Sequence, residues 1–307
     1  MTDERGKQAA RLDVPESGAS VSTRALGADS ALRDMAEGSE LFARLKNSLK
    51  KVVIDGKTYY VAEGDTLLDE AQLATYSLER EAREKLRAAR RAASEAGLGT
   101  IRLEGNTRGL VAQTQGGKIV RWRPGTVLSY RVIRETFPDQ ESYELVVSSM
   151  RAACLEWEQT CGVDFKHMSE LDGRPGTAPE GALFTVRAFD AGGEFIAAAF
   201  FPNDPKDRRH VLVDPSYYTT SFDPVGVFRH ELGHVLGFRH EHIRSEAPPD
   251  CPDEELFDTR NLGKYDPQSV MHYFCGEVGS SDLRITDLDR SGSQQVYGPP
   301  LSAVAEV

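Results

Sequence analysis

The sequence predicts an α/β protein, in which short strands alternate with helices most clearly between residues 118 and 298. Two observations carry this prediction. Runs of three to seven branched and aromatic residues lie between turn-forming residues, and longer segments place apolar residues at helical spacing. With 307 residues, of which 39% are hydrophobic, the chain can bury a full core in one main domain and an accessory segment.

Three helices are expected in this region. The first runs from about Asp139 to Gln159, because apolar residues recur on one of its faces. These residues are Tyr143, Val146, Val147, Met150, Cys154 and Trp157. The second helix starts near Pro224, with Asp223 as its N-cap and proline at the favoured first position. The third runs from about Thr286 to Tyr297 and ends at Gly298.

Five short segments are the strand candidates, and each is bounded by Gly, Pro, Asn or Asp. They are Val127–Ile133, Val163–Lys166, Leu183–Phe189, Phe195–Phe201 and Val211–Val213. The chain therefore predicts a sheet of several short strands combined with a few long helices.

The N-terminal third has a different character. Residues 1–40 are polar, rich in Ala, Ser, Gly and charge, and lack periodicity, which predicts a mobile segment. Val52–Val61 is expected to form a hairpin with Asp55-Gly56 as its turn. A long helix should follow from Thr66, which with Asp69 resembles a capping box.

That helix is expected to stop at Gly97, and the glycine-rich residues 99–117 are typical of a linker or cleavage region. The predicted organisation is a mobile N-terminus, a propeptide-like segment with a linker, a main domain and a tail. Their ranges are 1–40, 41–117, 118–298 and 299–307.

The segment from His230 to His240, HELGHVLGFRH, is the most informative in the chain. Residues four apart share one face of a helix, so His230 and His234 can hold one metal ion beside Glu231. Gly237 can adopt a left-handed conformation that ends the helix and brings His240 round as a third ligand. Three histidines leave one position on Zn²⁺ for water, whose proton Glu231 can take as general base. The segment therefore predicts one catalytic zinc ion and hydrolysis of peptide bonds without a covalent intermediate.

A short HExxH motif also arises by chance in polar helices. Requiring a glycine and a third histidine at fixed offsets reduces accidental matches roughly several hundredfold. The longer motif therefore favours the metal site.

With this motif, the chain resembles the metzincin clan of zinc endopeptidases, in which HExxHxxGxxH is followed by a methionine-containing turn. Residues 269–273, SVMHY, and Glu241 after the third histidine resemble the astacin family's version. The resemblance implies that Met271 lies beneath the metal as a hydrophobic base. It also implies that Tyr273 is a fifth zinc ligand, which moves out to stabilise the oxyanion.

The resemblance covers about Lys118 to Gly298. It implies a twisted, five-stranded mixed sheet with an active-site helix and a C-terminal helix, preceded by a helical propeptide-like segment. By analogy, Phe195–Phe201 would be the antiparallel edge strand that pairs with an extended substrate, although its alternation also fits plain sheet core. The chain departs from the astacin pattern after Arg244, where Ser245-Glu246 stands in place of aspartates.

The segment Tyr60–Asp65, YVAEGD, resembles the short acidic stretch of astacin propeptides, in which an aspartate coordinates zinc and keeps the enzyme latent. The resemblance makes Asp65 the candidate zymogen switch and Glu63 the second choice. An ordinary turn between hairpin and helix is the alternative interpretation. A cysteine switch is excluded within this sequence, because no cysteine precedes Cys154.

Four cysteines lie in the second half of the chain and allow three pairings, if the compartment is oxidising. A bridge between Cys251 and Cys275 would staple the segment that joins the zinc motif to the methionine turn. A bridge between Cys154 and Cys161 requires the helix to end between them, since seven helical residues span about 10 Å. Free buried cysteines are the alternative.

The charge balance limits the partners. With 37 basic and 48 acidic residues, the net charge of -11 argues against nucleic acid or anionic membranes. No stretch approaches the roughly 18 apolar residues of a membrane span, and residues 1–40 contain no apolar segment that resembles a signal peptide. The expected partner is a protein or peptide substrate, and the resemblance implies a secreted or extracytoplasmic protein.

Two functions remain open. The first is a zinc endopeptidase made as a zymogen, and the second is a catalytically silent, zinc-containing protein that binds peptides or a partner. An inactive relative would be expected to lose the general base before the ligands, so the intact Glu231 favours catalysis.

Overall fold

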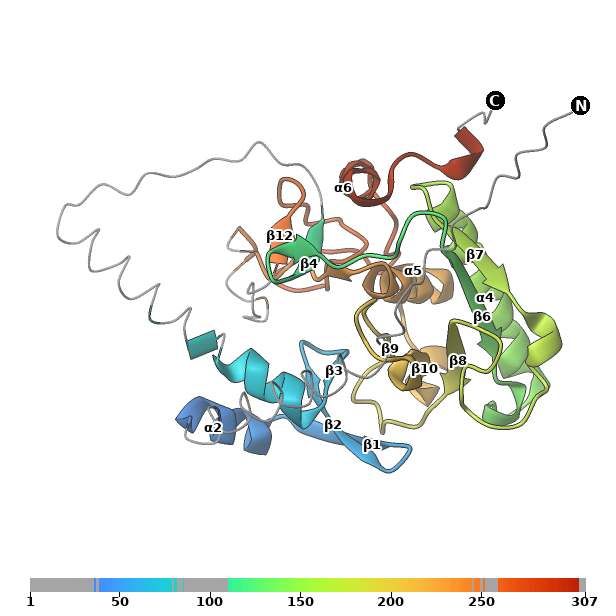
Figure 1. Cartoon of the computed structure of the whole chain (residues 1–307), viewed down its shortest axis with the longest axis horizontal. Helices are drawn as coiled ribbons and strands as arrows, with labels where there is room; N and C mark the ends of the chain where they lie inside the picture. Colours follow the sequence, from blue (N-terminus) through green and yellow to red (C-terminus); the bar gives the residue numbers. More distant parts are fainter. Residues whose placement is uncertain are drawn as a thin grey trace, which may run out of the picture.

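The computed structural model describes residues 36, 39–78, 80–81, 85, 110–244, 246–248, 251 and 259–303. It is a mixed α/β fold, as predicted. Figure 1 shows the N-terminal helices and strands lying against one side of a larger region that contains α4, α5 and α6. The predicted mobile segment falls almost entirely outside the described residues, as do the predicted helix stop at Gly97 and most of the linker.

The main sheet has five strands in the order β7-β6-β8-β10-β9. Its members are β6 (Val127–Val132), β7 (Asp164–His167), β8 (Phe184–Ala188), β9 (Ala197–Ala198) and β10 (His210–Val213). Four strands are parallel, and β9 pairs antiparallel with β10 at the edge. The predicted five-stranded mixed sheet with an antiparallel edge strand is confirmed.

The edge strand is shorter than predicted. Only Ala197 and Ala198 of the expected segment pair with β10. The backbone N–H of Phe201 donates instead to the Asp204 carboxylate at 2.8 Å, and the ring of Phe200 packs into the main core. The chain therefore turns away from the sheet after Ala198.

Helices α4 (Gln140–Glu158) and α5 (Pro224–Val235) pack against each other and contact strands of this sheet, and α6 (Asp287–Tyr297) lies above α5 in Figure 1. The predicted helix starts and the predicted N-cap Asp223 are confirmed, and Asp139, Asp223 and Thr286 each accept a hydrogen bond from the first turn of their helix. The Trp157 indole N–H donates to the Arg229 carbonyl oxygen at 2.9 Å, which fixes α4 against α5.

A second sheet supports the chain just before the third histidine. It contains β4 (Val111–Gln115), β5 (Lys118–Ile119), β11 (Phe238–Arg239) and β12 (Thr259–Asn261). β4 pairs antiparallel with both β11 and β12. Residues 111–115, which the sequence places in the linker, thus form a central strand of this sheet, while the domain boundaries themselves stay a prediction. Beyond α6, Leu301–Ala303 of the predicted tail forms a 3-10 turn, η5.

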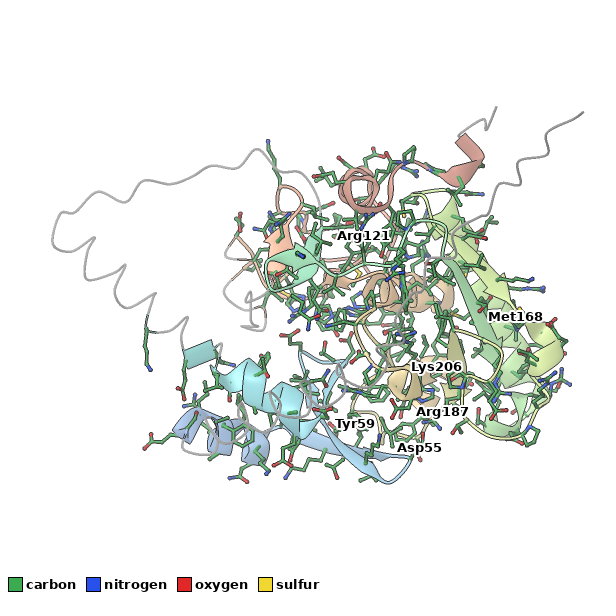
Figure 2. All side chains as sticks on the ribbon, in the orientation of Figure 1. Asp55, Tyr59, Arg121, Met168, Arg187 and Lys206 are labelled. Carbon is green, nitrogen blue, oxygen red and sulfur yellow. A yellow bond between two sulfur atoms is a disulfide. The ribbon has the colours of Figure 1, made fainter. Side chains whose placement is uncertain are left out.

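The N-terminal segment begins with α2 (Glu40–Ser48), followed by β1 (Lys50–Ile54), β2 (Lys57–Ala62) and β3 (Thr66–Leu68). The predicted hairpin is confirmed, with Asp55 and Gly56 in the turn at φ of 48° and 79°. Figure 2 shows Asp55, at the tip of this hairpin, beside Arg187 of β8.

The predicted helix start at Thr66 is wrong. Residues 66–68 form β3, which pairs with Tyr60–Ala62, and the helix begins at Glu70. Its cap is formed by Asp69 and Gln72, whose side chains each accept a hydrogen bond from the other's backbone N–H, at 2.8 and 3.0 Å. Pairing with β2 places Thr66 in a strand, so Asp69 caps the helix instead.

Candidate metal centre

Helix α5 and the turn after it bring three imidazoles together. His230 and His234 lie on one face of the helix, as their spacing predicts. The predicted turn at Gly237 is confirmed by its φ of 91°, and a Cβ there would lie 2.5 Å from the Val120 carbonyl oxygen. The short strand β11 then pairs with β4 and returns His240 to the other two histidines.

The orientation of two rings is fixed by backbone carbonyls. His230 Nδ1 lies 2.8 Å from the Val270 carbonyl oxygen, and His234 Nδ1 lies 2.8 Å from that of Phe238. A carbonyl oxygen only accepts, so each neutral ring carries its proton on Nδ1 and presents the lone pair of Nε2. All three rings are buried, which protects the centre from bulk water.

Asp65 of the N-terminal segment completes this cluster. One carboxylate oxygen lies 3.3 Å from the Nε2 atoms of both His230 and His240, and the other lies 3.6 Å from that of His234. The Nε2 atoms of His234 and His240 are 3.1 Å apart. Ligands bound tetrahedrally at about 2.0–2.1 Å from zinc lie about 3.3 Å from one another. The spacing of these four residues therefore fits one zinc ion.

The chemistry of the donors points the same way. Imidazole nitrogens held with their lone pairs inward and a carboxylate are all electron-pair donors, and this donor set suits Zn²⁺. Burial opposes the ionisation of Asp65, yet the neighbouring imidazoles, His240 above all, hold the pKa of this carboxyl well below its usual range. Burial lowers the pKa of His234 to about 4, so this ring is neutral at neutral pH, as a metal ligand must be.

Glu231 lies next to the cluster and is buried. Its Oε2 atom has no hydrogen-bond partner among the described residues, and its side chain lines a cavity of about 390 Å³ together with Val227 and Phe222. Burial and the nearby Asp65 carboxylate raise the pKa of Glu231 well above its ordinary value. A carboxylate in this state is a strong proton acceptor facing the space that a substrate would enter.

The methionine turn lies under the cluster. Met271 is fully buried, and its Sδ atom lies so close to α5 that a Cβ on Gly233 would stand 2.2 Å from it. The ring of Tyr273 lies 4.4 Å from that of His240, between ring centroids, and its hydroxyl donates to the Asp65 carboxylate. The structure thus brings every residue of the predicted site to one place.

A buried polar network, which the sequence did not indicate, holds this turn in position. The Glu241 backbone N–H donates to the Met271 carbonyl oxygen at 2.8 Å, and its side chain accepts from Arg244 at 2.8 Å. Asp289 of α6 accepts from Ser269 Oγ at 2.5 Å and from the Val270 N–H at 2.8 Å. Third histidine, methionine turn and C-terminal helix are therefore linked by hydrogen bonds.

Cys251 and Cys275 form a disulfide, whereas Cys154 and Cys161 are buried thiols. Of the pairings that the sequence allows, the structure contains the Cys251–Cys275 bridge, which links the two ends of the loop between the zinc motif and the methionine turn. Cys275 also lines the cavity beside Glu231, so the bridge fixes one wall of the cleft.

The N-terminal segment contacts the rest of the chain through charges that the sequence did not reveal. Glu63, the second choice for the switch, pairs with Arg239 instead of approaching the histidines. Farther along, Arg208 donates to Asp69 and to the Leu67 carbonyl oxygen, both at 3.0 Å. These partners are 139 or more residues apart in the chain, so no local spacing marks them.

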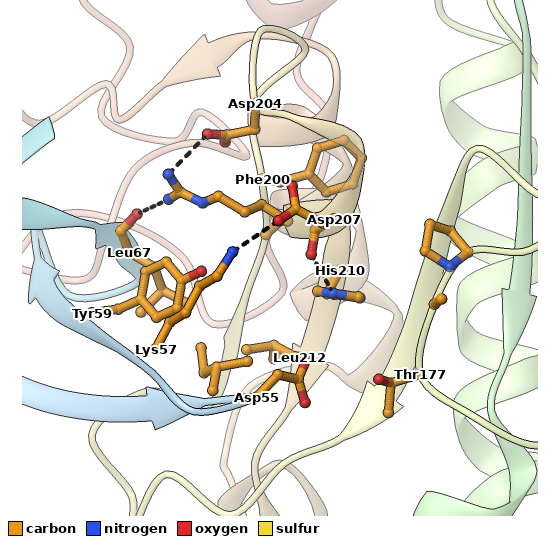
Figure 3. A pocket seen from close by; sticks show the side chains of 15 residues that line it. Asp55, Lys57, Tyr59, Leu67, Thr177, Phe200, Asp204, Asp207, His210 and Leu212 are labelled. Atoms are coloured by element: carbon orange, nitrogen blue, oxygen red, sulfur yellow. Dashed lines mark hydrogen bonds and ion pairs between the residues drawn. The ribbon is translucent and has the colours of Figure 1, made fainter. Parts of the chain in front are cut away.

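Figure 3 shows the same contact area around a cavity of about 250 Å³ between the hairpin and the main sheet. Lys57 reaches across to Asp207 at 2.9 Å, and the guanidinium of Arg208 lies 5.0 Å from the ring centroid of Tyr59. Apolar side chains of the hairpin pack beside them against Phe195, Ala198 and Leu212. The segment is therefore docked on the sheet as well as on the metal centre.

Comparisons with known proteins agree with this site. Residues 121–247 match the model of the Matrixin family. Over 62 residues the chain is 45% identical to the astacin-like metalloendopeptidase of Gallus gallus, a stretch that covers 16% of this chain and 15% of that protein. Over 123 residues it is 31% identical to matrix metalloproteinase-21 of Xenopus laevis, covering 38% of this chain and 20% of that protein.

Among solved structures, high choriolytic enzyme 1, a hatching enzyme zinc-protease from Oryzias latipes, is 16% identical and superposes with a TM-score of 0.39. That superposition covers 61% of this chain and 99% of the other. The chain spans 15 to 20% of the length of the two curated relatives named above. The resemblance to metzincin-type zinc proteases, astacin-like ones included, is confirmed. Within the described residues, no helix is both long and apolar enough to cross a bilayer.

Proposed function

We propose that this protein is a zinc-dependent metalloendopeptidase that is made as a latent zymogen. The observation that carries the proposal is the convergence of three Nε2 atoms, from His230, His234 and His240, beside the buried carboxylate of Glu231. The substrate class is a protein or peptide. Secretion, which the sequence resemblance implies, remains a proposal of the same kind.

The proposed ligands are the three histidines, which would hold one zinc ion. When bound, zinc supplies Lewis-acid chemistry that polarises a carbonyl group and acidifies water. Glu231 accepts the proton of the attacking water and passes it to the leaving amine, a role for which a raised pKa is suited. The Tyr273 hydroxyl, held beside His240, donates a hydrogen bond to the oxyanion once it leaves Asp65.

The edge strand β9 supplies the place for the substrate backbone. Within the described sheet β9 pairs only with β10, so its outer edge can accept an extended peptide. The cavity that Glu231 lines runs past Ala197 of this strand. A peptide added there would pass directly over the metal centre.

Latency is proposed to come from Asp65. Its carboxylate lies among the three Nε2 atoms, where it takes the position that a water would need. Gly64 allows this approach, because a Cβ there would lie 2.9 Å from the Tyr273 hydroxyl. Ion pairs of Asp55, Glu63 and Asp69 with buried or nearly buried arginines hold the segment in place.

The test is the variant Glu231→Gln, which keeps the size of the side chain but removes the base. We expect zinc content to stay at one ion per chain while peptide cleavage falls by about 1000-fold or more. Zinc is measured by metal analysis and cleavage with a quenched fluorescent peptide. Undiminished cleavage by this variant would refute the role of Glu231. If the unaltered, processed chain binds zinc but cleaves no peptide, the silent peptide-binding alternative is favoured.

A further inference from the structure

Arg239 stands in an unusual position for a charged residue. It immediately precedes the proposed ligand His240, and its side chain is 11% exposed. Its guanidinium donates to both carboxylate oxygens of Glu63, whose side chain is only 1% exposed. The pair is therefore a nearly dry contact between the N-terminal segment and the wall of the metal centre.

Glu63 reaches Arg239 from the cleft. It lies two residues before Asp65, so the same short stretch of chain fills the metal position and the position in front of Arg239. Arg239 and Glu63 line a hollow together with Phe201 and Gln113, and the Arg239 guanidinium lies 5.9 Å from the Phe201 ring centroid. The cavity beside Glu231 is formed by other elements, among them Phe222 and Phe274. Arg239 thus lies at a hollow that is separate from the cavity beside Glu231.

We propose that Arg239 is a specificity-determining residue, which binds an acidic side chain of the substrate in the subsite that Glu63 fills. The proposal rests on the proposed function, because it takes the N-terminal segment to occupy the path of the substrate. The preferred substrates are peptides with a glutamate or aspartate close to the cleaved bond. Release of the segment removes Glu63 from the guanidinium, and an acidic side chain of the substrate replaces it.

The physical reason is the poor solvation of the arginine. A cation held at a nearly buried site, beside an aromatic ring and a backbone strand, is stabilised most by an anion that it can contact through two hydrogen bonds. A glutamine of the same shape offers one acceptor oxygen and no charge. Truncating a partner of such a desolvated pair costs far more than losing a surface pair.

The nearby Arg208 makes a useful contrast. It also pairs with an acidic residue of the segment, Asp69, but Asp204 of its own loop lies 3.7 Å from its guanidinium. Arg208 therefore keeps an anion after the segment leaves.

The experiment uses the full chain, loaded with zinc, in an Asp65→Ala/Glu63→Ala background that frees both the metal position and the subsite in front of Arg239. Its substrates are quenched fluorescent peptides of one neutral sequence, in which a single Glu or Gln is moved through the three positions on each side of the cleaved bond. We expect one position at which Glu raises kcat/KM over Gln by about tenfold or more. Mass spectrometry of the products maps that position.

Variants of Arg239 separate the possible outcomes. Arg239→Gln should reduce the Glu-to-Gln ratio to less than about twofold, and Arg239→Glu should favour a Lys peptide over a Glu peptide. Arg239→Lys should retain part of the preference, because it keeps the charge but replaces the planar guanidinium with a compact, more strongly hydrated ammonium group. The matched control is Arg260→Gln, which removes a positive charge from the exposed strand β12 and should leave the ratio unchanged.

Cleavage without any preference for Glu, or a preference that survives in Arg239→Gln, would overturn the proposal and leave the peptidase function intact. A zinc-loaded Asp65→Ala/Glu63→Ala chain that cleaves none of the peptides would overturn the proposed function, and the assignment of Arg239 with it. Zinc content and thermal unfolding of each variant show that a lost preference does not come from a lost metal site.

Discussion

The two parts of the molecule are held together in different ways. The region that carries the metal centre has a continuous apolar core, which includes Trp157, Phe228 and Met271, and its buried polar groups form a hydrogen-bonded network. The N-terminal segment has a small core of its own and docks through a few apolar side chains and ion pairs. Ion pairs that reach water weaken in salt, whereas a packed core does not. The difference fits the proposed zymogen, in which the N-terminal segment leaves and the rest of the chain stays folded.

The largest effect that tests this contrast is expected from Asp65→Ala. Removing the carboxylate from the metal position should raise peptide cleavage by the full-length, zinc-loaded chain about 100-fold, since breaking one buried ionic contact costs about 3 kcal/mol. The measurement is the rate on a quenched fluorescent peptide. The control Asp69→Asn removes a charge of the same segment far from the metal and should change the rate less than about tenfold. Equal rates for both variants would show that Asp65 has no special role.

Acid should weaken the main region through His210, which lies under the docked hairpin. Its ring contacts Thr185 Oγ1 at 2.6 Å and the Asp207 carbonyl oxygen at 3.0 Å, and burial together with Arg187 lowers its pKa to about 4. The folded pKa lies below the unfolded value, so stability is full above about pH 6.5 and falls as the pH drops towards 4.

At pH 5 this loss should amount to about 2 kcal/mol. Urea unfolding of the unaltered chain and of His210→Gln at pH 7 and pH 5 measures it, because the histidine's share is the difference between the two pH dependences. Parallel losses in both proteins would mean that His210 titrates normally when folded.

Gly233→Ala tests the packing of the metal centre without touching the segment. The added Cβ would meet Met271 Sδ at 2.2 Å, and moving the flexible methionine should cost about 2 kcal/mol. Urea unfolding and zinc affinity are the measurements. Gly173→Ala, where a Cβ meets nothing within 4 Å, is the matched control and should change stability by less than about 0.5 kcal/mol. No difference between the two variants would contradict the tight contact between methionine turn and helix.

The smallest effect is expected from Arg208→Gln, which removes the contacts of Arg208 with Asp69 and the Leu67 carbonyl oxygen. Docking should weaken by about 1 kcal/mol, which would raise the basal rate of the full chain about fivefold at low salt. In 0.5 M salt, the concentration chosen for the assay, the two proteins should converge, because screening weakens the pair in the unaltered chain. Arg284→Gln, which removes an exposed pair in the main region, should have no effect on the rate.

The fold of the main region could be largely predicted from local signals. Asp139, Asp223 and Thr286 mark helix starts by their own hydrogen-bonding chemistry, and Gly237 marks the turn that returns His240. The spacing of the three histidines depends on a helix and one turn, both of which are encoded within eleven residues. Such features need no knowledge of distant parts of the chain.

The rest depends on distant partners. Thr66 begins a strand because Ala62 is available to pair with it, although its own neighbours favour a helix cap. The contact between Arg239 and Glu63 joins residues 176 positions apart, and neither has a neighbour that indicates the other. Among these long-range contacts, the disulfide between Cys251 and Cys275 could be predicted as one of three possible pairings, because a disulfide joins two cysteines and the chain has four.

Gly64 has a consequence for how tightly the proposed latent state can be kept. Its φ of 87° and the 2.9 Å that separate a Cβ from the Tyr273 ring leave no room for even a methyl group. An alanine at this position would push the loop away from the tyrosine while every charged residue of the latch stayed unchanged. In the proposed zymogen, any side chain at position 64 would therefore loosen the inhibitory loop and raise premature digestion by freshly made chains.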